Sequence, residues 1–451
     1  TRCLSDWSSD VCSSDLTGGN GVASGLIDSH TGLADVLVLN GDTVEGHVGA
    51  ADGTLAFTIT LAPATGLVTF TEYRSAMAPP GTNTDDNEAV SLATGIVTLI
   101  ATVTKAGISQ DVTLDLGSRL VIVEDDPSIS ASGTVPSLTL SEAHLTATLL
   151  DDNIAGSAPN ATLTTTSADF STAFTSVQGA DGATISYALT ITGGNGTASG
   201  LIDSHTGLAD LLVLNGNTIE GHVGTATGTL AFTIAVDPIT GRVTFTEYRA
   251  VVHPLGPNPD SGEALALDAG LISLVATITD KDADFRSASI DLGKQLTITD
   301  DGPSIKASGT TPSLTLSETH LTATTLDDNI AGSAPDALLT TTSADFSRAF
   351  SSVQGADGAT ISYALTITGG NGAASGLIDS HTGCADVLVL NGNAIEGHVG
   401  TTTGTLAFTI TLDPATGLVT FTEYRAVTQP RGTDPDRSEE RRVGKECRSR
   451  W

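Results

Sequence analysis

Three aspartates at alternate positions, Asp280, Asp282 and Asp284, are the strongest candidates in this sequence for binding a metal ion. Carboxylates that converge from a tight loop can supply the oxygen ligands that Ca²⁺ takes in sets of about six to eight. The loop is not an EF-hand, because Phe285 stands where that loop needs glycine. The sequence therefore predicts a calcium site at this loop, and a solvated hairpin tip is the alternative.

A second acidic pair, Asp300 and Asp301, directly precedes Gly302 and Pro303. A Gly-Pro pair cannot continue a central strand, so one structural module ends here and the next begins at Ser304. We predict a calcium ion between modules at Asp300 and Asp301. The alternative is that these polar residues only end a strand.

The acidic loop is not repeated everywhere in the chain. At the corresponding place in an earlier repeat, residues 104–109 have the sequence TKAGIS, which is one residue shorter and carries no carboxylate. Calcium is therefore not expected to be essential to every repeat.

Asp203, Ser204 and His205 have the residue types of a hydrolase triad. Three consecutive residues cannot converge as nucleophile, base and orienting group, because neighbouring side chains on a strand point apart. His205, Glu220 and His222 have zinc-binding side chains but lack the spacing of known zinc motifs. A turn and a strand edge are the preferred interpretation, so the sequence predicts no catalytic residue and no enzyme.

Alternating apolar residues on both sides of the acidic loop predict the element that positions it. Period-two alternation across a turn is typical of a β-hairpin with one buried face. A second hairpin is predicted around the turn at 237–241, DPITG. Further strands are expected at 184–191 and 210–214, and helical signals are poor. The residues that alternate before and after the acidic loop are Ile272, Leu274, Ala276 and Ile278, then Ala288, Ile290 and Leu292.

The chain is a tandem repeat. TGGNG begins at Thr17, Thr192 and Thr368, which gives spacings of 175 and 176 residues. The predicted fold class is all-β, with Ig-like β-sandwich repeats of about 176 residues in an extended array. One or two sub-domains per repeat both remain open. The predicted boundaries are 17–127 for the end of a first repeat, 128–303 for a complete second repeat and 304–436 for the start of a third.

The two ends of the chain differ in composition from the repeats. Residues 1–16 and 437–451 resemble translated sequencing adaptors, and they contain both tryptophans and three of the four cysteines. We therefore exclude them from the repeat architecture. We expect them to share no core with the repeats.

Charge and hydropathy narrow the class of protein. The formal net charge is −33 and the sequence pI is about 4.2, which argues against nucleic acid as a partner because its phosphates attract Lys and Arg. No apolar run approaches the roughly 20 residues of a membrane helix, so no membrane insertion is expected. The acidic, Gly-rich composition instead fits an extracellular protein whose negative charges keep it soluble by mutual repulsion or bind divalent cations.

The order of several motifs resembles a known family. LTLSE, ADFSTAFTSVQGADG, ISYALTITGGNGTASGLID and DDGPSI follow one another as in the tandem repeats-in-toxin (RTX) domain of giant type I-secreted bacterial proteins. The resemblance implies an adhesin-like protein at the bacterial cell surface or outside the cell, whose repeats form an extended stalk. Neighbouring repeats and an unknown surface or glycan target are then the expected partners.

Two other functions stay open at this point. The repeats could bind a glycan or another partner through loops such as residues 251–263, or they could be passengers of an RTX toxin or a secreted enzyme. Exposed aromatic residues would favour the binding alternative, but Tyr187 and Tyr248 both lie in strand patterns.

Overall fold

The computed structural model describes residues 10–77, 89–123, 125–146, 154–180, 182–253, 263–281, 283–322 and 331–428. In these ranges the chain forms β-strands and single-turn 3-10 helices. It divides into two compact units, with the boundary between Asp300 and Asp301. The first unit contains the first two copies of the repeat, and each of these copies has its own hydrophobic core. The predicted all-β class with tandem repeats is confirmed.

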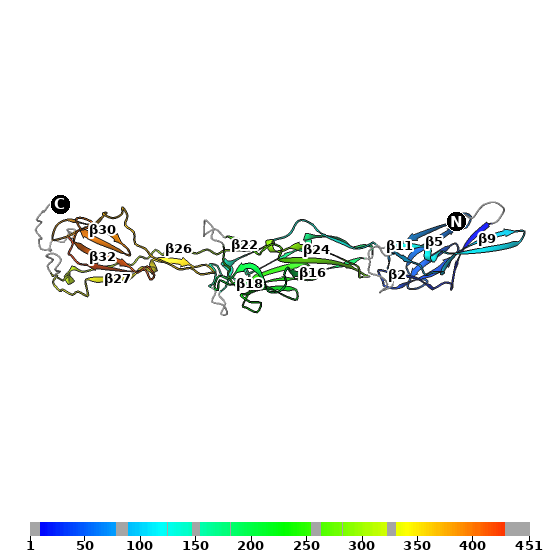
Figure 1. Ribbon diagram of the computed structural model, residues 1–451, viewed down its shortest axis with the longest axis horizontal. Helices are drawn as coiled ribbons and strands as arrows, with labels where there is room; N and C mark the ends of the chain where they lie inside the picture. The colour runs from blue at the N-terminus through cyan, green and yellow to red at the C-terminus, as the bar shows by residue number, and fades with distance from the viewer. Residues whose placement is uncertain are drawn as a thin grey trace. The chain divides into compact units, whose positions relative to one another are not determined.

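Each copy builds a six-stranded antiparallel sheet in which five strands correspond from copy to copy, while the sixth strand of the first copy pairs at the opposite edge (Figure 1). In the second copy the order is β14-β21-β20-β19-β18-β17, and the third copy repeats it as β27-β33-β32-β31-β30-β29. In the first copy the order is β6-β5-β4-β3-β2-β7. The strands of the second copy are β14 (Thr165–Asp169), β17 (Thr197–Ile202), β18 (Ala209–Asn215), β19 (Thr218–Val223), β20 (Leu230–Val236) and β21 (Arg242–Glu247). Those of the first copy are β2 (Val22–Asp28), β3 (Ala34–Asn40), β4 (Thr43–Val48), β5 (Leu55–Ala62), β6 (Leu67–Glu72) and β7 (Ala76–Met77). Those of the third copy are β27 (Thr341–Asp345), β29 (Ala374–Ile378), β30 (Ala385–Asn391), β31 (Ala394–Val399), β32 (Leu406–Leu412) and β33 (Leu418–Glu423).

The predicted hairpin at 237–241 joins β20 to β21. The Asp237 carboxylate accepts hydrogen bonds from the N–H groups of Ile239 and Thr240 at 2.9 and 3.2 Å. Gly241 closes the turn with a φ of 69°, a conformation that favours glycine. This local chemistry fixes the register in which Ile234 pairs with Phe245, so both side chains enter the core.

A close backbone approach explains the glycine of the recurring EGHVG motif. A Cβ atom on Gly221 would lie 2.2 Å from Cε1 of the Phe232 ring on the neighbouring strand. The same contact occurs at Gly46 and Gly397 in the other copies. The glycine therefore leaves room for a core aromatic ring on the next strand.

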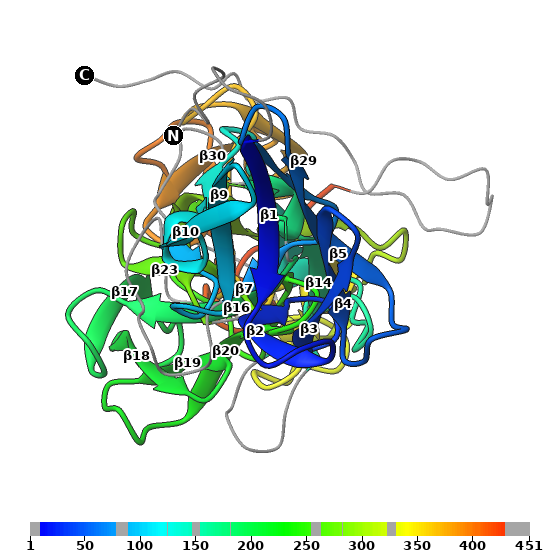
Figure 2. The same ribbon diagram turned by 90° about the vertical axis from the view of Figure 1, so that its right-hand side faces the viewer.

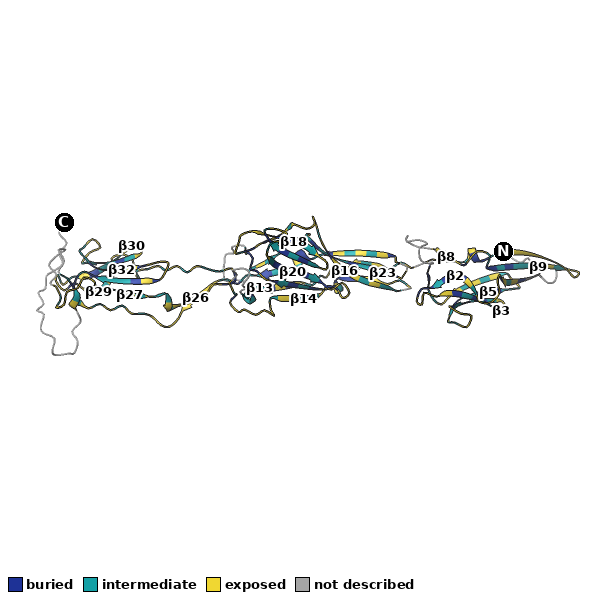
Figure 3. Cartoon of the chain, turned by 90° about the horizontal axis from the view of Figure 1, so that it is seen from below, coloured by how far each residue is buried: buried dark blue, intermediate teal, exposed yellow. Residues whose placement is uncertain are grey.

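A second layer covers this sheet in the second copy, and the buried residues lie between the layers (Figure 3). The predicted hairpin around the acidic loop belongs to it. Alternate residues of β23 are buried, and Ile272, Leu274 and Ile278 are fully so. The strands of this layer are β12 (Ser128–Ala131), β13 (Leu138–Ser141), β15 (Phe174–Val177), β16 (Ala183–Ile191), β22 (Ala264–Ala266), β23 (Ile272–Asp280), β24 (Phe285–Asp291) and β25 (Leu296–Thr299). They form three small sheets, β16-β23-β24, β13-β25-β22 and β12-β15.

In the first copy, part of the amino-terminal segment belongs to the fold, contrary to the expectation. Residues 10–16 form β1 (Asp10–Leu16), which pairs with β9 (Val97–Lys105) (Figure 2). Cys12 is fully buried and Leu16 nearly so, and both belong to the core of this copy. The expectation that residues 1–16 share no core with the repeats is therefore wrong for residues 10–16. The layer is completed by β8 (Ala89–Ser91), β10 (Ile108–Asp115) and β11 (Val121–Val123).

Residues 10–16 join the first copy because β9 would otherwise have an unpaired edge. In the second copy β16 pairs with β23 in the register that β1 adopts on β9, so β1 occupies the position of a repeat strand. The hydroxyl of Ser14 is buried there without a hydrogen-bond partner among the described residues, where the second copy has Leu189. The segment thus pairs with the backbone hydrogen-bonding groups of β9, but it fills the core less well than β16 does in the second copy. Residues 437–451 lie outside the described residues.

In the described part of the third copy, little of the covering layer is formed. Of that layer it has only β26 (Ser304–Ala307) and β28 (Phe350–Val353) within the described residues, and residues 359–367 form no strand. As a result Ile410 and Phe421 are only half-buried, whereas Ile234 and Phe245 of the second copy are fully buried. The 3-10 helices of the three copies are η1 (Gly117–Arg119), η2 (Glu142–His144), η3 (Ser171–Ala173), η4 (Gly293–Gln295), η5 (Glu318–His320) and η6 (Ser347–Ala349).

Candidate functional site

The acidic loop joins β23 to β24, and two of its three aspartates are described. Asp280 and Asp284 are both buried. Oδ1 of Asp280 accepts a hydrogen bond from the N–H of Asp284 at 2.8 Å, and the N–H of Asp280 donates to the carbonyl of Asp284 at 3.1 Å. Ala283 closes the loop with a φ of 86°, which is unusual for a residue other than glycine. The structure thus brings Asp280 and Asp284 together, while Asp282 lies outside the described residues.

Asp300 and Asp301, predicted as one linker site, fall into different units. Asp300 follows β25 and belongs to the first unit. Asp301 is buried in the second unit. Its carbonyl oxygen approaches Gly355 so closely that a Cβ atom added to this glycine would lie 2.1 Å away. The structure therefore assigns Asp300 to a group of residues that the sequence did not predict.

That group consists of Glu142, His253 and Asp300. One ligand atom from each of these residues lies within 4.8 Å of the other two. Nε2 of His253 is 3.3 Å from Oε1 of Glu142, and the same oxygen accepts a hydrogen bond from the N–H of Val251 at 2.8 Å. The side chains of Glu142 and His253 are 0% and 4% exposed. The group thus consists of a buried imidazole, a buried carboxyl group and the half-buried carboxyl group of Asp300.

The topology explains why these residues meet. β13 and β25 are parallel neighbours, with Ser141 opposite Thr299, so the next residues, Glu142 and Asp300, emerge side by side. The bond from Val251 to Glu142 holds the chain that follows β21 against the same edge. The sequence signal was weak, because the two strands have only four residues each and lie far apart in the chain.

Glu247, the last residue of β21, is a further buried acid near Glu142. It is 2% exposed, and neither carboxyl oxygen has a hydrogen-bond partner among the described residues. Burial raises the pKa of Glu247 well above its usual range, and the charge of Glu142 raises it further. The third copy repeats this arrangement, with the pKa of Glu423 raised to about 7 by burial and by Glu318.

The recurring LIDSHTG and FTEYR motifs meet in a buried ion pair. In the second copy the guanidinium of Arg249 donates to both carboxylate oxygens of Asp203 at 2.6 and 3.1 Å. Burial raises the pKa of Asp203, but the hydrogen bonds from Arg249 and Thr206 outweigh it and leave that pKa below its usual value. The corresponding pairs in the other copies are Asp28–Arg74 and Asp379–Arg425.

A second aspartate lies buried beside each ion pair. In the second copy this is Asp210, and neither of its carboxyl oxygens has a hydrogen-bond partner among the described residues. Burial and the charge of Asp203 raise the pKa of Asp210 to about 7. A carboxyl group with such a pKa is typical of an acid or base catalyst. Asp203 and Asp210 are both 0% exposed, however, so a substrate has no access to them in this conformation.

The histidines of the weaker zinc hypothesis do not form one group around the motif. His205 is exposed in the turn after Asp203. Nε2 of His222 contacts Oε2 of Glu220 at 3.0 Å, and its Nδ1 contacts the carbonyl of Gly228 at 2.8 Å. Both ring nitrogens of His222 are therefore engaged within the protein, which leaves neither ready to bind a metal.

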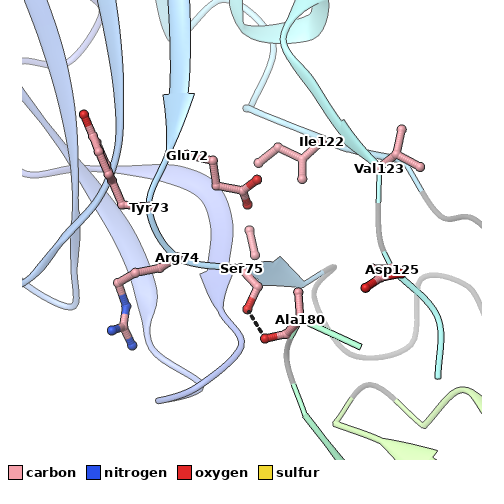
Figure 4. A pocket seen from close by; sticks show the side chains of 9 residues that line it. Glu72, Tyr73, Arg74, Ser75, Ile122, Val123, Asp125 and Ala180 are labelled. Atoms are coloured by element: carbon pink, nitrogen blue, oxygen red, sulfur yellow. Dashed lines mark hydrogen bonds between the residues drawn. The ribbon is translucent and has the colours of Figure 1, made fainter. Parts of the chain in front are cut away.

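A cavity of about 350 Å³ lies in the first unit, between the end of β6 and β11 (Figure 4). Its lining includes Glu72, Arg74 and Asp125. The hydroxyl of Ser75 donates to the carbonyl of Ala180 at 3.3 Å on one side of it. This cavity contains none of the aspartates of the acidic loop.

Fold and site together define a tandem β-sandwich repeat protein, and each of its three copies buries a recurring pair of aspartates. The chain belongs to the family described as a domain of unknown function, DUF5801, whose model matches residues 11–117, 137–293 and 313–445. A search of curated proteins found no match, and a search of solved structures found none either. Among the described residues no helix is long and apolar enough to cross a membrane.

Proposed function

We propose that this chain is a structural repeat region that extends a secreted or cell-surface protein of the RTX adhesin type and performs no catalysis itself. The observation that carries the proposal is the use of the recurring polar residues. In each of the three copies an aspartate bonds to an arginine, and separately a glutamate bonds to a histidine, both within the same copy. Polar residues that bond within a copy stabilise the module, which supports a structural role.

The proposal includes calcium at the acidic loop of the second copy. Asp280 and Asp284 bring two buried carboxyl groups into one loop. A bound cation would neutralise them and restrict the motion of the hairpin. The extracellular location rests on the acidic composition and on the motif resemblance, and millimolar calcium outside cells suits the affinity of such sites.

The test is the length of engineered arrays. Proteins with one, two and four copies of residues 128–303 are compared by small-angle X-ray scattering in millimolar CaCl₂ and in NaCl of equal ionic strength. A spacer predicts a maximum dimension that rises in proportion to copy number and a stiffer array with calcium. A maximum dimension that stops rising with copy number would contradict the proposal.

The alternative of a binding repeat has one observation in its favour. Tyr248 of the FTEYR motif is 38% exposed, and Tyr73 in the first copy is 58% exposed, whereas Tyr187 is buried in the core. Aromatic residues on a surface are common in ligand-binding sites. Most of the loop at 251–263 lies outside the described residues. Specific glycan binding that is lost in Tyr248→Ala would favour this alternative.

A further inference from the structure

We propose that Glu142, His253 and Asp300 bind one divalent transition-metal ion, with zinc as the chemical type. The three residues come from the ends of β13 and β25 and from the chain after β21, so an ion would cross-link three segments of the second copy. The proposal is independent of the spacer function and of the calcium loop.

The donor set selects the kind of metal. An imidazole nitrogen with two carboxylate oxygens is a combination that Zn²⁺ accepts, with bonds of about 2.0–2.2 Å. Ca²⁺ prefers sets made of oxygen alone. The spread of the three ligand atoms, within 4.8 Å of one another, is compatible with one ion after a small closure of the side chains.

Glu247 supplies a second, independent observation. Its strand, β21, packs against β13, whose end carries Glu142. The Glu247 side chain is 2% exposed, and both its carboxyl oxygens lack a hydrogen-bond partner among the described residues. An acid buried in this way is costly unless a cation or a hydrogen-bond donor lies nearby. A metal ion beside Glu142 would supply that partner, with Glu247 as a fourth ligand or as a neutralised neighbour.

Glu263 adds a fourth carboxyl group to the same edge. Its carbonyl accepts a hydrogen bond from the N–H of Asp300 at 3.1 Å, which makes the two residues cross-strand neighbours. Oε1 of Glu263 is buried without a hydrogen-bond partner among the described residues. Glu247 and Glu263 thus add negative charge to the surroundings of the three proposed ligands, and a divalent cation would offset it.

The complete ligand set occurs only in the second copy, which predicts one metal ion per chain. The third copy keeps the glutamates as Glu318 and Glu423, but the sequence has Gln429 at the position of His253. The first copy has Ala78 there. Gln429 and Ala78 lie outside the described residues, so this comparison rests on the sequence alone.

The experiment is a titration of the chelator-treated full chain with ZnCl₂ by isothermal calorimetry, in millimolar CaCl₂ to occupy any oxygen-only sites. We expect one equivalent of Zn²⁺ at micromolar affinity or tighter. Titration with Co²⁺ should give visible absorption bands of a low-coordinate site with a nitrogen ligand. Absence of micromolar Zn²⁺ binding would overturn the proposal.

The decisive variant is His253→Gln, which copies the residue of the third repeat. Loss of a residue that hydrogen-bonds to a metal ligand typically weakens metal binding about tenfold to a hundredfold. Because His253 is proposed as a ligand itself, its loss should weaken Zn²⁺ binding by at least as much. His222→Gln removes a histidine that bonds to Glu220 and Gly228, and it should leave Zn²⁺ binding unchanged. Asp300→Asn provides a second ligand variant if circular dichroism shows that His253→Gln is unfolded. Unchanged affinity in the folded ligand variants, or loss of binding in His222→Gln, would overturn the assignment.

Discussion

At the scale of single residues, the second copy is organised around buried acids that differ in their partners. Asp203 has a bidentate arginine and keeps its charge, while Asp210 beside it has no hydrogen-bond partner among the described residues. Two carboxylates near one arginine repel each other, so the less well bonded group takes up a proton more readily. The same division occurs in the first and third copies, where the pKa values of Asp35 and Asp386 are raised to about 6.

Asp210→Asn should flatten the pH dependence of stability. In the folded protein the pKa of Asp210 is raised from 3.8 to about 7, so the folded state holds a proton that the unfolded state has already released. Stability should therefore fall as the pH rises through this window, by roughly 1.4 kcal/mol for each unit of difference in pKa. Urea unfolding of residues 128–303 from pH 4 to 8 measures this slope.

Two details make this measurement specific. Glu247 also has a raised pKa and contributes a fall of the same sign, so the slope of the variant should shrink without vanishing. Asp237→Asn is the control, because the backbone N–H groups of Ile239 and Thr240 lower the pKa of Asp237. Its slope above pH 4 should match that of the unmodified protein. An equal slope in Asp210→Asn would show that Asp210 is ionised in the folded state.

At the scale of elements, the β23–β24 hairpin and its counterpart β9–β10 form a natural comparison. Both are antiparallel with continuous register. The second copy has an acidic loop, whereas the first has Lys105 and a tighter turn in which Ala106 has a φ of 51°. The hairpin therefore forms without acidic residues in its loop. The aspartates of the second copy are not required for this pairing and can serve another role.

Calcium should raise the melting temperature of residues 128–303. An ion that binds only the folded form stabilises it by RT ln(1 + [Ca²⁺]/Kd), and sites of extracellular modules would give on the order of 1 kcal/mol at millimolar calcium. The double variant Asp282→Asn, Asp284→Asn should lose most of this gain. Differential scanning calorimetry in CaCl₂ and in NaCl of matched ionic strength provides the measurement.

The comparison of repeats controls for non-specific effects of the ion. A complete repeat that carries the TKAGIS loop in place of the acidic loop should respond to calcium less. If the melting temperature of the unmodified repeat does not change and calorimetry detects no binding up to several millimolar calcium, the loop is a solvated hairpin tip.

At the scale of the whole molecule, the copies share a sheet but differ in how much of it is covered. The second copy buries a continuous core between its layers, and the first copy completes its own with β1. The third copy has the same six-stranded sheet, with half-buried Ile410 and Phe421 where a second layer would lie. Because burial of apolar surface is the main stabilising term, the copies should differ in stability.

The fragment 128–303 should unfold cooperatively and be more stable than 304–436. The shorter fragment lacks the equivalents of β23 and β24, so it leaves apolar surface and a strand edge in water. Urea unfolding should give it a lower midpoint and a smaller m value, since m follows the surface exposed on unfolding. Equal stability of the two fragments would mean that the covering layer is a separate sub-domain.

Features that depend on neighbouring residues could be predicted from the sequence. The tandem spacing, the alternation of β23 and the turn at Asp237 were all predicted, because turn chemistry and period-two patterns act over a few residues. Asp280 and Asp284 were likewise placed in one loop, since four positions of chain separate them. The identity of the ion remains a prediction.

The remaining features depend on long-range contacts, because a strand needs a partner. The sequence ISYALTI lies in β16 at 185–191, where β23 pairs with it, and forms no strand at 361–367. DVCSSDL, which carries no repeat motif, became strand β1 because β9 offered an unpaired edge. Glu142 and Asp300 meet because β13 and β25 pair in parallel across 158 residues of sequence. Such long-range pairing depends on the backbone hydrogen bonds and core contacts of the whole repeat, which no short stretch of sequence contains.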